Sequence, residues 1–131
     1  MAIVKRQILR NQTPTAITTS YAASGIALKH PASAGQSPLI SGIASGLFVF
    51  VSSIVSATSL SVVITDDEAG DRPLIPETAA TLQTGMTTAT KGGAVYQIDI
   101  QVYDSREPVF AWVKTNTGSL TVDEIILTYS A

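Results

Sequence analysis

The hydrophobic and polar positions of the chain alternate mainly with the two-residue period of β-strands. The alternation is clearest over residues 96–102, where one face is apolar and the other polar, which predicts a strand with one buried face. Residues 109–115 carry Phe110 and Trp112 on one face and small apolar residues on the other. This second pattern predicts a central strand covered on both sides, with both aromatic rings in the core.

A turn and a returning strand are predicted at the C-terminal end. Residues 116–119 read NTGS, in which Asn and Gly tolerate the positive φ angles of tight turns. Residues 120–129 are again rich in apolar positions, so the two strands are expected to form a β-hairpin. The apolar positions change parity within this last strand, which predicts a β-bulge near Asp123 and Glu124.

The rest of the chain also divides into short apolar segments separated by turn sequences. Candidate strands cover residues 3–10, 15–21, 25–29, 46–53 and 59–65. Residues 66–77 form an acidic segment in which Pro73 and Pro76 should prevent continuous strand pairing, so an exposed loop is expected. Residues 79–90 suit either a short helix or a strand, and their threonines favour extended chain with a turn near Gly85.

These segments predict an all-β fold. They amount to about seven to nine short strands, with turn signals roughly every 8–12 residues and no long helix, which is typical of an antiparallel β-sandwich with a jelly-roll-like arrangement. The chain has 131 residues, the usual size of one domain. Residues 1–131 are therefore expected to form a single β-sandwich domain.

One uncharged stretch is long enough to cross a membrane. No charged side chain lies between His30 and Asp66, and residues 39–65 are largely apolar. Serines interrupt this stretch, and its apolar residues fall into short runs rich in β-branched side chains. Two buried strands joined by a Ser/Thr/Ala turn explain the pattern better than a transmembrane helix, so no membrane association is expected.

The N-terminus concentrates positive charge. Lys5, Arg6 and Arg10 lie within the first ten residues, so residues 1–14 are a possible basic arm that contacts phosphate or an acidic protein surface. The apolar residues between them favour an ordinary edge strand. No apolar run of signal-peptide length follows, which makes cytoplasmic synthesis the default. The net charge of −2 argues against nucleic-acid binding by bulk electrostatic attraction.

Catalytic chemistry has little support in the sequence. The chain has no cysteine and one histidine, His30, which precedes Pro31 in a loop rich in Ser, Ala and Gly. The candidate ligands for a hard cation such as calcium are the acidic residues Asp66, Asp67, Glu68 and Asp71. Their spacing does not follow the EF-hand pattern, and a solvated loop is favoured. We expect no enzymatic activity, no metal and no cofactor.

The composition instead favours association with other protein. Hydrophobic residues make up 45% of the chain and charged residues only 14%, so much of the surface must consist of neutral hydroxyl and small apolar groups. Burying a hydroxyl between subunits costs less than burying a charge. The protein is therefore expected to be a homo-oligomer or part of a repeating assembly.

A resemblance to a known class of proteins agrees with this expectation. The small all-β chain, rich in Ser, Thr, Ala and Gly and ending in FAWVKTNTGSLTVDEIILTYSA, resembles the capsid decoration or cement proteins of tailed bacteriophages. The resemblance implies a viral structural protein, made in the host cytoplasm, that binds the outer surface of the virion capsid. It further implies a trimer that clamps neighbouring major capsid protein subunits, with no cofactor.

On this hypothesis, the contacts to the shell come from the N-terminal segment and two loops. The candidate contact residues are Lys5, Arg6, Arg10, His30, Pro31, Arg72, Pro73, Leu74 and Ile75. The alternative is a carbohydrate-binding or receptor-binding β-sandwich, such as a tail-fibre domain. That alternative predicts Trp112 or Tyr103 exposed in a shallow groove beside polar side chains.

Overall fold

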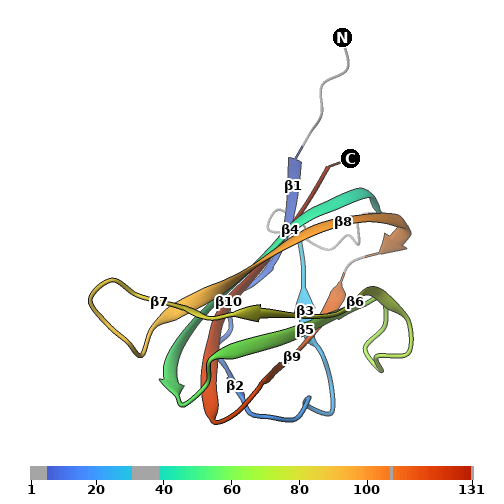
Figure 1. The fold of residues 1–131 in the computed structure, drawn as a ribbon. Coiled ribbons are helices and arrows are strands. Elements are labelled where there is room, and N and C mark those ends of the chain that lie inside the picture. The colour runs from blue at the N-terminus through green and yellow to red at the C-terminus, as the bar shows by residue number, and fades with distance from the viewer. Residues whose placement is uncertain (1–5, 31–38, 107, 131) are drawn as a thin grey trace.

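The chain folds as two antiparallel β-sheets packed face to face (Figure 1). The structure is a computed structural model that describes residues 6–30, 39–106 and 108–130. The regular elements in these ranges are ten β-strands: β1 (Arg6–Asn11), β2 (Thr15–Ile17), β3 (Ile26–Leu28), β4 (Leu39–Val55), β5 (Ser59–Thr65), β6 (Pro73–Thr81), β7 (Gln83–Thr84), β8 (Gly92–Arg106), β9 (Val109–Thr115) and β10 (Ser119–Ser130). The predicted all-β sandwich is confirmed.

The two sheets differ in size. Sheet A has the strand order β1-β10-β4-β8-β7, with the short β2 also paired to β10, and sheet B has the order β3-β9-β5-β6. The long strands β4, β8 and β10 form the middle of sheet A. Strand β9 lies inside sheet B, between β3 and β5, so its predicted central position is confirmed.

The core lies between the sheets and follows from the alternation of side chains. In β9 every second residue from Val109 to Thr115 is buried, and in β8 Ala94 and Tyr96 are buried while Val95 is exposed. The hydroxyl of Tyr96 donates a hydrogen bond of 2.6 Å to the backbone carbonyl of Leu60 in sheet B. Burial of the phenol raises its pKa above the usual value, so this bond links the two sheets through a neutral group.

The predicted hairpin between the last two strands is wrong. Strand β9 pairs with β3 and β5, whereas β10 pairs with β1, β2 and β4, so the turn at residues 116–118 passes from sheet B to sheet A. Both strands have a strongly apolar face, and placing them in opposite sheets lets those faces meet across the core. Edge-to-edge pairing would instead have left the two apolar faces side by side on one sheet.

The predicted bulge in β10 is confirmed. The pairing of β10 with β4 shifts register between Val122 and Glu124, so Asp123 has no partner in β4. The shift keeps Val122 and Ile125 both on the core side, where both are buried. A strict two-residue period would have turned one of them outward.

The uncharged stretch 39–65 forms two strands, as predicted, and the structure places them in different sheets. Strand β4 belongs to sheet A and β5 to sheet B, and residues 56–58 connect them. No helix in the described part of the chain has the length and apolar character needed to span a bilayer. The apolar residues of this stretch instead supply much of the sandwich core.

The prolines of the acidic segment do not prevent pairing. Residues 66–72 form the predicted loop, but strand β6 begins at Pro73 and pairs with β5. Strand β6 is the edge of sheet B, where a residue without a backbone N–H is tolerated on the side facing away from the sheet. Two register shifts in this pairing, between Val62 and Ile64 and between Ile64 and Thr65, accommodate the irregular backbone.

Candidate functional site

The predicted contact residues that the structure describes lie in two separate parts of the fold. Arg6 and Arg10 belong to β1, which confirms an edge strand at the N-terminus; Lys5 lies outside the described residues. The backbone of Arg10 exchanges two hydrogen bonds, of 2.9 and 3.0 Å, with Lys29 next to β3, which joins this edge of sheet A to sheet B. His30 follows Lys29, and Pro31 lies outside the described residues.

The second group of predicted contact residues is only partly at the surface. Ile75 is 2% exposed and lies in the core, so its side chain does not reach a partner, and Leu74 packs half-buried against the core. The two outward residues are Pro73 and Arg72. The guanidinium of Arg72 lies 3.1 Å from the Asp66 carboxylate, a pairing within the loop itself. Such a surface pair contributes little stability.

The acidic loop is organised by its own hydrogen bonds. The two carboxylate oxygens of Asp67 accept bonds of 3.0 and 2.9 Å from the backbone N–H groups of Asp71 and Arg72. Desolvation acts to raise the pKa of Asp67, but these bonds outweigh it and hold the pKa below its usual value. No group of three or more potential metal ligands occurs within the ranges that the structure describes. Through these two bonds, the Asp67 side chain shapes the turn.

Replacing Asp67 by asparagine is expected to destabilise the protein at neutral pH and to have less effect in acid. The carboxylate contributes stability above its unfolded pKa, and that contribution is lost as the pH falls through the lower folded pKa. The difference in free energy of unfolding between wild type and Asp67→Asn should thus shrink between about pH 5 and pH 2. Urea titrations at several pH values measure it, and a difference independent of pH would contradict this role.

Trp112 is not a core residue, contrary to the prediction. Strand alternation buries Val113 between the sheets and leaves Trp112 half-buried on the outer face of sheet B. Its indole N–H donates a hydrogen bond of 2.9 Å to the hydroxyl of Thr65. The ring contacts the backbone of Gly25 and Gly70, where an added Cβ atom would lie 3.0 and 2.8 Å from ring atoms. Trp112 therefore anchors two loops on this face.

A shallow hollow lies beside this ring. It encloses about 310 Å³ and is lined by Tyr21, Val63, Thr65, Ala69, Gly70 and Trp112. The side chain of Tyr103, the other aromatic residue considered for such a groove, lies outside the described residues. The lining combines two aromatic rings with small side chains, as in many sites for small ligands.

Polar groups border the hollow at Tyr21. The Tyr21 hydroxyl donates a hydrogen bond to the Glu77 carboxylate, and the Lys114 ammonium lies 3.2 Å from the same oxygen and 4.8 Å from the centre of the Tyr21 ring. The bond from Tyr21, followed by that from Lys114, lowers the pKa of Glu77. Burial and the bond to Glu77 raise the pKa of Tyr21. These three groups bind one another.

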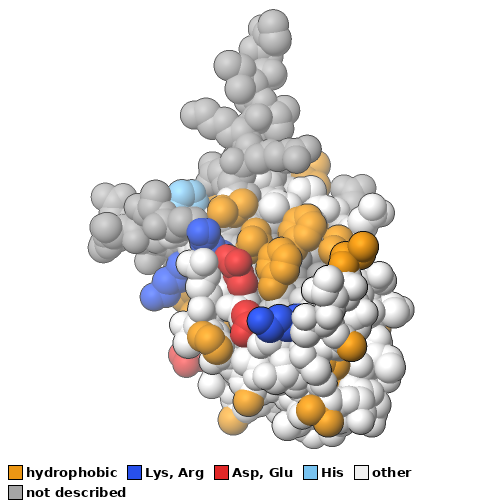
Figure 2. Space-filling view, turned by 90° about the vertical axis from the view of Figure 1, so that its left-hand side faces the viewer, with side chains coloured by type: hydrophobic (Ala, Val, Ile, Leu, Met, Phe, Trp, Pro, Cys, Tyr) orange, Lys and Arg blue, Asp and Glu red, His pale blue; other side chains and the backbone are white. Residues whose placement is uncertain are grey.

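The outer face of sheet A carries a second apolar surface. The register places Phe48 of β4 between Val95 of β8 and Ile126 of β10, and Phe50 between Gly93 and Glu124. Phe50 is 47% and Val95 57% exposed, while Phe48 and Ile126 are half-buried. Figure 2 shows hydrophobic side chains gathered over the middle of the face that lies to the left in Figure 1, with charged side chains mostly to one side. We call Phe48, Phe50, Val95 and Ile126 the apolar patch.

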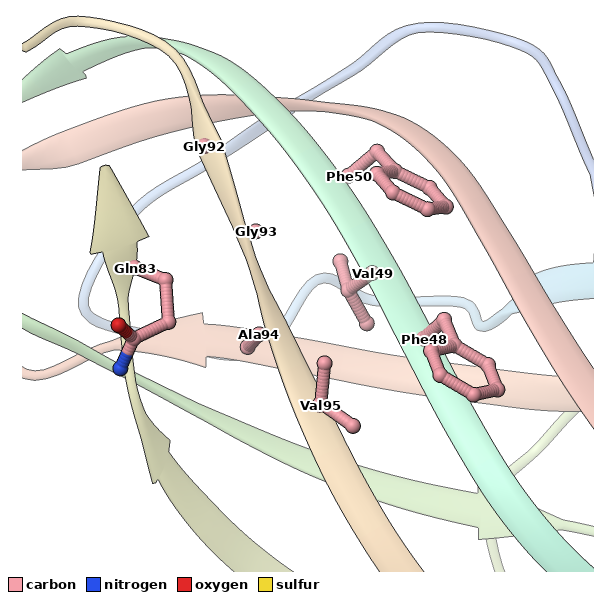
Figure 3. A pocket seen from close by; sticks show the side chains of 8 residues that line it. All are labelled: Phe48, Val49, Phe50, Gln83, Gly92, Gly93, Ala94 and Val95. Carbon is pink, nitrogen blue, oxygen red and sulfur yellow. The ribbon is translucent and has the colours of Figure 1, made fainter. Parts of the chain in front are cut away.

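A second hollow adjoins the apolar patch. It encloses about 360 Å³ and is lined by Phe48, Val49, Phe50, Gln83, Gly92, Gly93, Ala94 and Val95. Figure 3 shows the rings of Phe48 and Phe50 leaving β4 on one side, with no side chain on β8 at the two glycines. The hollow therefore has backbone at the two glycines and is bordered by aromatic and aliphatic side chains and by Gln83.

Sequence reasoning missed the apolar patch, although its signal was present. The run LFVFV at residues 47–51 is apolar at every position, which predicts burial on both faces of a strand. In the structure Leu47, Val49 and Val51 point into the core, and nothing in the described part of the chain covers the opposite face.

No family model, no curated protein and no solved structure matches this chain.

Proposed function

We propose that this protein is a structural component of a protein assembly, and specifically a virion protein that decorates a capsid shell. The observation that carries the proposal is the apolar patch on the outer face of sheet A. Phe50 and Val95 are about half exposed there, on a rigid strand surface rather than on a loop. Neighbouring exposed apolar side chains on a folded domain mark surfaces that other molecules cover.

The physical argument concerns the cost of leaving the patch in water. Fully burying a large apolar side chain is worth about 1.5–3 kcal/mol relative to exposing it. The neighbouring outward groups include the hydroxyls of Thr128 and Ser45, which lie 3.1 Å apart and bond to each other. A partner can cover such hydroxyl groups without burying an unpaired charged group. A shell presents many identical sites, so modest contacts add up.

A second candidate function is binding of a carbohydrate or a receptor. It is favoured by the hollow beside Trp112 and Tyr21, which has aromatic walls and the polar pair Glu77 and Lys114 at its border. Sugar rings stack on aromatic side chains while their hydroxyls bind polar groups. Against this candidate, Gly25 and Gly70 already lie on the Trp112 ring, which reduces the ring surface left for a ligand.

Co-sedimentation separates the two candidates. Purified protein is mixed with tailed-phage capsid shells that lack a decoration protein, and separately with insoluble polysaccharides. Saturable sedimentation with the shells and none with the polysaccharides is the expected result. Sedimentation with a polysaccharide alone, abolished by Trp112→Ala, would establish the second candidate and overturn the first. A protein that sediments with neither overturns the decoration proposal for those shells.

A further inference from the structure

We infer that the outer face of sheet A is an interface between two copies of this chain. The copies are related by a two-fold axis that lies along this face, parallel to β4 and β8 and midway between them. The inference rests on the proposed structural function. It assigns the apolar patch to a second copy of the chain, so that any contact between the resulting dimer and a shell comes from other surfaces of the dimer. A two-fold interface uses the same surface on both copies, so each feature of that surface must fit another feature of it. The face of sheet A meets this condition in both shape and charge.

The shape argument comes from the register of β4 and β8. Phe50 lies directly beside Gly93, and Phe48 directly beside Val95. An axis between the strands exchanges β4 of one copy with β8 of the other. Phe50 of each copy then lies over Gly93 of its partner, and Phe48 over Val95.

The two members of the first pair fit each other. Phe50 is 47% exposed and projects from the face, whereas Gly93 has no side chain and floors a hollow of about 360 Å³. That space is large enough to accept a phenylalanine ring from a second copy. A protruding ring beside a hollow, on adjacent strands, becomes a matched pair of contacts when the face meets itself.

The charges on the face are also self-complementary. Asp123 and Glu124 lie on the β10 side of the apolar patch, and the Ser52 hydroxyl holds Asp123 outward with a hydrogen bond of 3.1 Å. Lys91 lies on the other side, at the turn before β8, and is exposed. Among the described residues none of these three charged groups forms a salt bridge within 4 Å.

The same axis brings the opposite charges together. Exchange of the two sides places β10 of one copy against the β7–β8 turn of the other, so Lys91 faces the Asp123 and Glu124 pair of its partner. Arg10 pairs with Ile126 across β1 and β10, on the side of the patch away from β4. Complementary charges at the border of an apolar interface set its register and exclude other arrangements.

The first test is a concentration series by sedimentation equilibrium with the full chain. The wild type is expected to be a dimer that dissociates on dilution, and Phe50→Thr should raise the dissociation constant at least tenfold. Val55→Thr is the matched control, because Val55 lies on the same strand and is 59% exposed but outside the apolar patch. It should leave the dissociation constant unchanged. Urea unfolding confirms that both variants remain folded.

A charge exchange tests the axis itself. Lys91→Glu and Glu124→Lys should each weaken the dimer about tenfold, because each places like charges opposite one another. The double variant restores opposite charges across the interface and should return the dissociation constant to within about threefold of wild type. Two single defects that simply add in the double variant would overturn the proposed axis.

The remaining outcomes also decide the inference. A wild type that stays monomeric up to about 100 μM, or a trimer unaffected by Phe50→Thr, overturns the two-copy interface. Shell co-sedimentation reports on the proposed function separately. A monomeric wild type that still sediments with shells would retain the decoration function without this interface, whereas a dimer that ignores shells would retain the interface without that function.

Discussion

Replacing Gly118 by alanine is expected to lower the free energy of unfolding by more than about 2 kcal/mol. Gly118 has a φ of +64°, in the left-handed region that favours glycine. A Cβ atom built on it would lie 1.8 Å from the backbone oxygen of Val55 at the end of β4. The turn that carries the chain from sheet B to sheet A must therefore shift before any side chain fits.

Urea unfolding of the purified variants measures this effect. Thr117→Ala is the matched control, because Thr117 is the exposed neighbour in the same turn and should change stability by less than about 0.5 kcal/mol. Gly118→Asn separates the two causes, since asparagine tolerates positive φ but also has a Cβ atom. It should lose nearly as much stability as the alanine variant. Equal stability of Gly118→Ala and wild type would contradict the close approach of this turn to β4.

Replacing Leu60 by alanine is expected to lower the free energy of unfolding by about 3–5 kcal/mol. Leu60 is completely buried in β5, between β9 and β6. Its backbone carbonyl accepts a hydrogen bond from the Tyr96 hydroxyl of the opposite sheet. The Leu60 side chain therefore lies where the two sheets meet. Truncation removes apolar contacts and leaves a cavity that strands on both sides hold open.

Truncation of an exposed residue in the same uncharged stretch provides the control. Val55→Ala removes two carbon atoms from a side chain that is 59% exposed and should cost less than about 1 kcal/mol. Thermal or urea unfolding of both variants gives the comparison. If the two substitutions cost the same, Leu60 does not occupy the centre of the core, and the division of residues 39–65 into two facing strands is wrong.

The secondary structure of this chain follows closely from local patterns. The alternation around Tyr96 and the change of parity near Asp123 each reflect which side chains must leave water, so they predict a strand and a bulge correctly. The prolines of β6 misled the prediction because proline excludes only a paired N–H. An edge strand such as β6 has a neighbouring strand on one side only, so a proline whose nitrogen faces the open side removes no hydrogen bond from the sheet.

The placement of Trp112 and the apolar patch was beyond local reasoning. An apolar side chain at position 48, 50 or 112 indicates burial, but it does not say whether another sheet, a loop or a second molecule provides the cover. In the structure, loops with Gly25 and Gly70 cover much of Trp112, while Phe50 remains open. The contrast arises from the lengths and paths of connections that lie far from these residues in sequence.

The strand-built sandwich and its weakly charged surface follow from the amino-acid sequence, because the period of the side chains and the composition are properties of short segments that add along the chain. The tertiary structure alone decided which strands share a sheet, that residues 116–118 cross between the sheets, and which of two apolar faces meets the other sheet. Those choices depend on contacts between distant segments, such as the pairing of β10 with β4. Which of these arrangements forms is decided by the free energy of the whole folded chain rather than by the preference of any single residue.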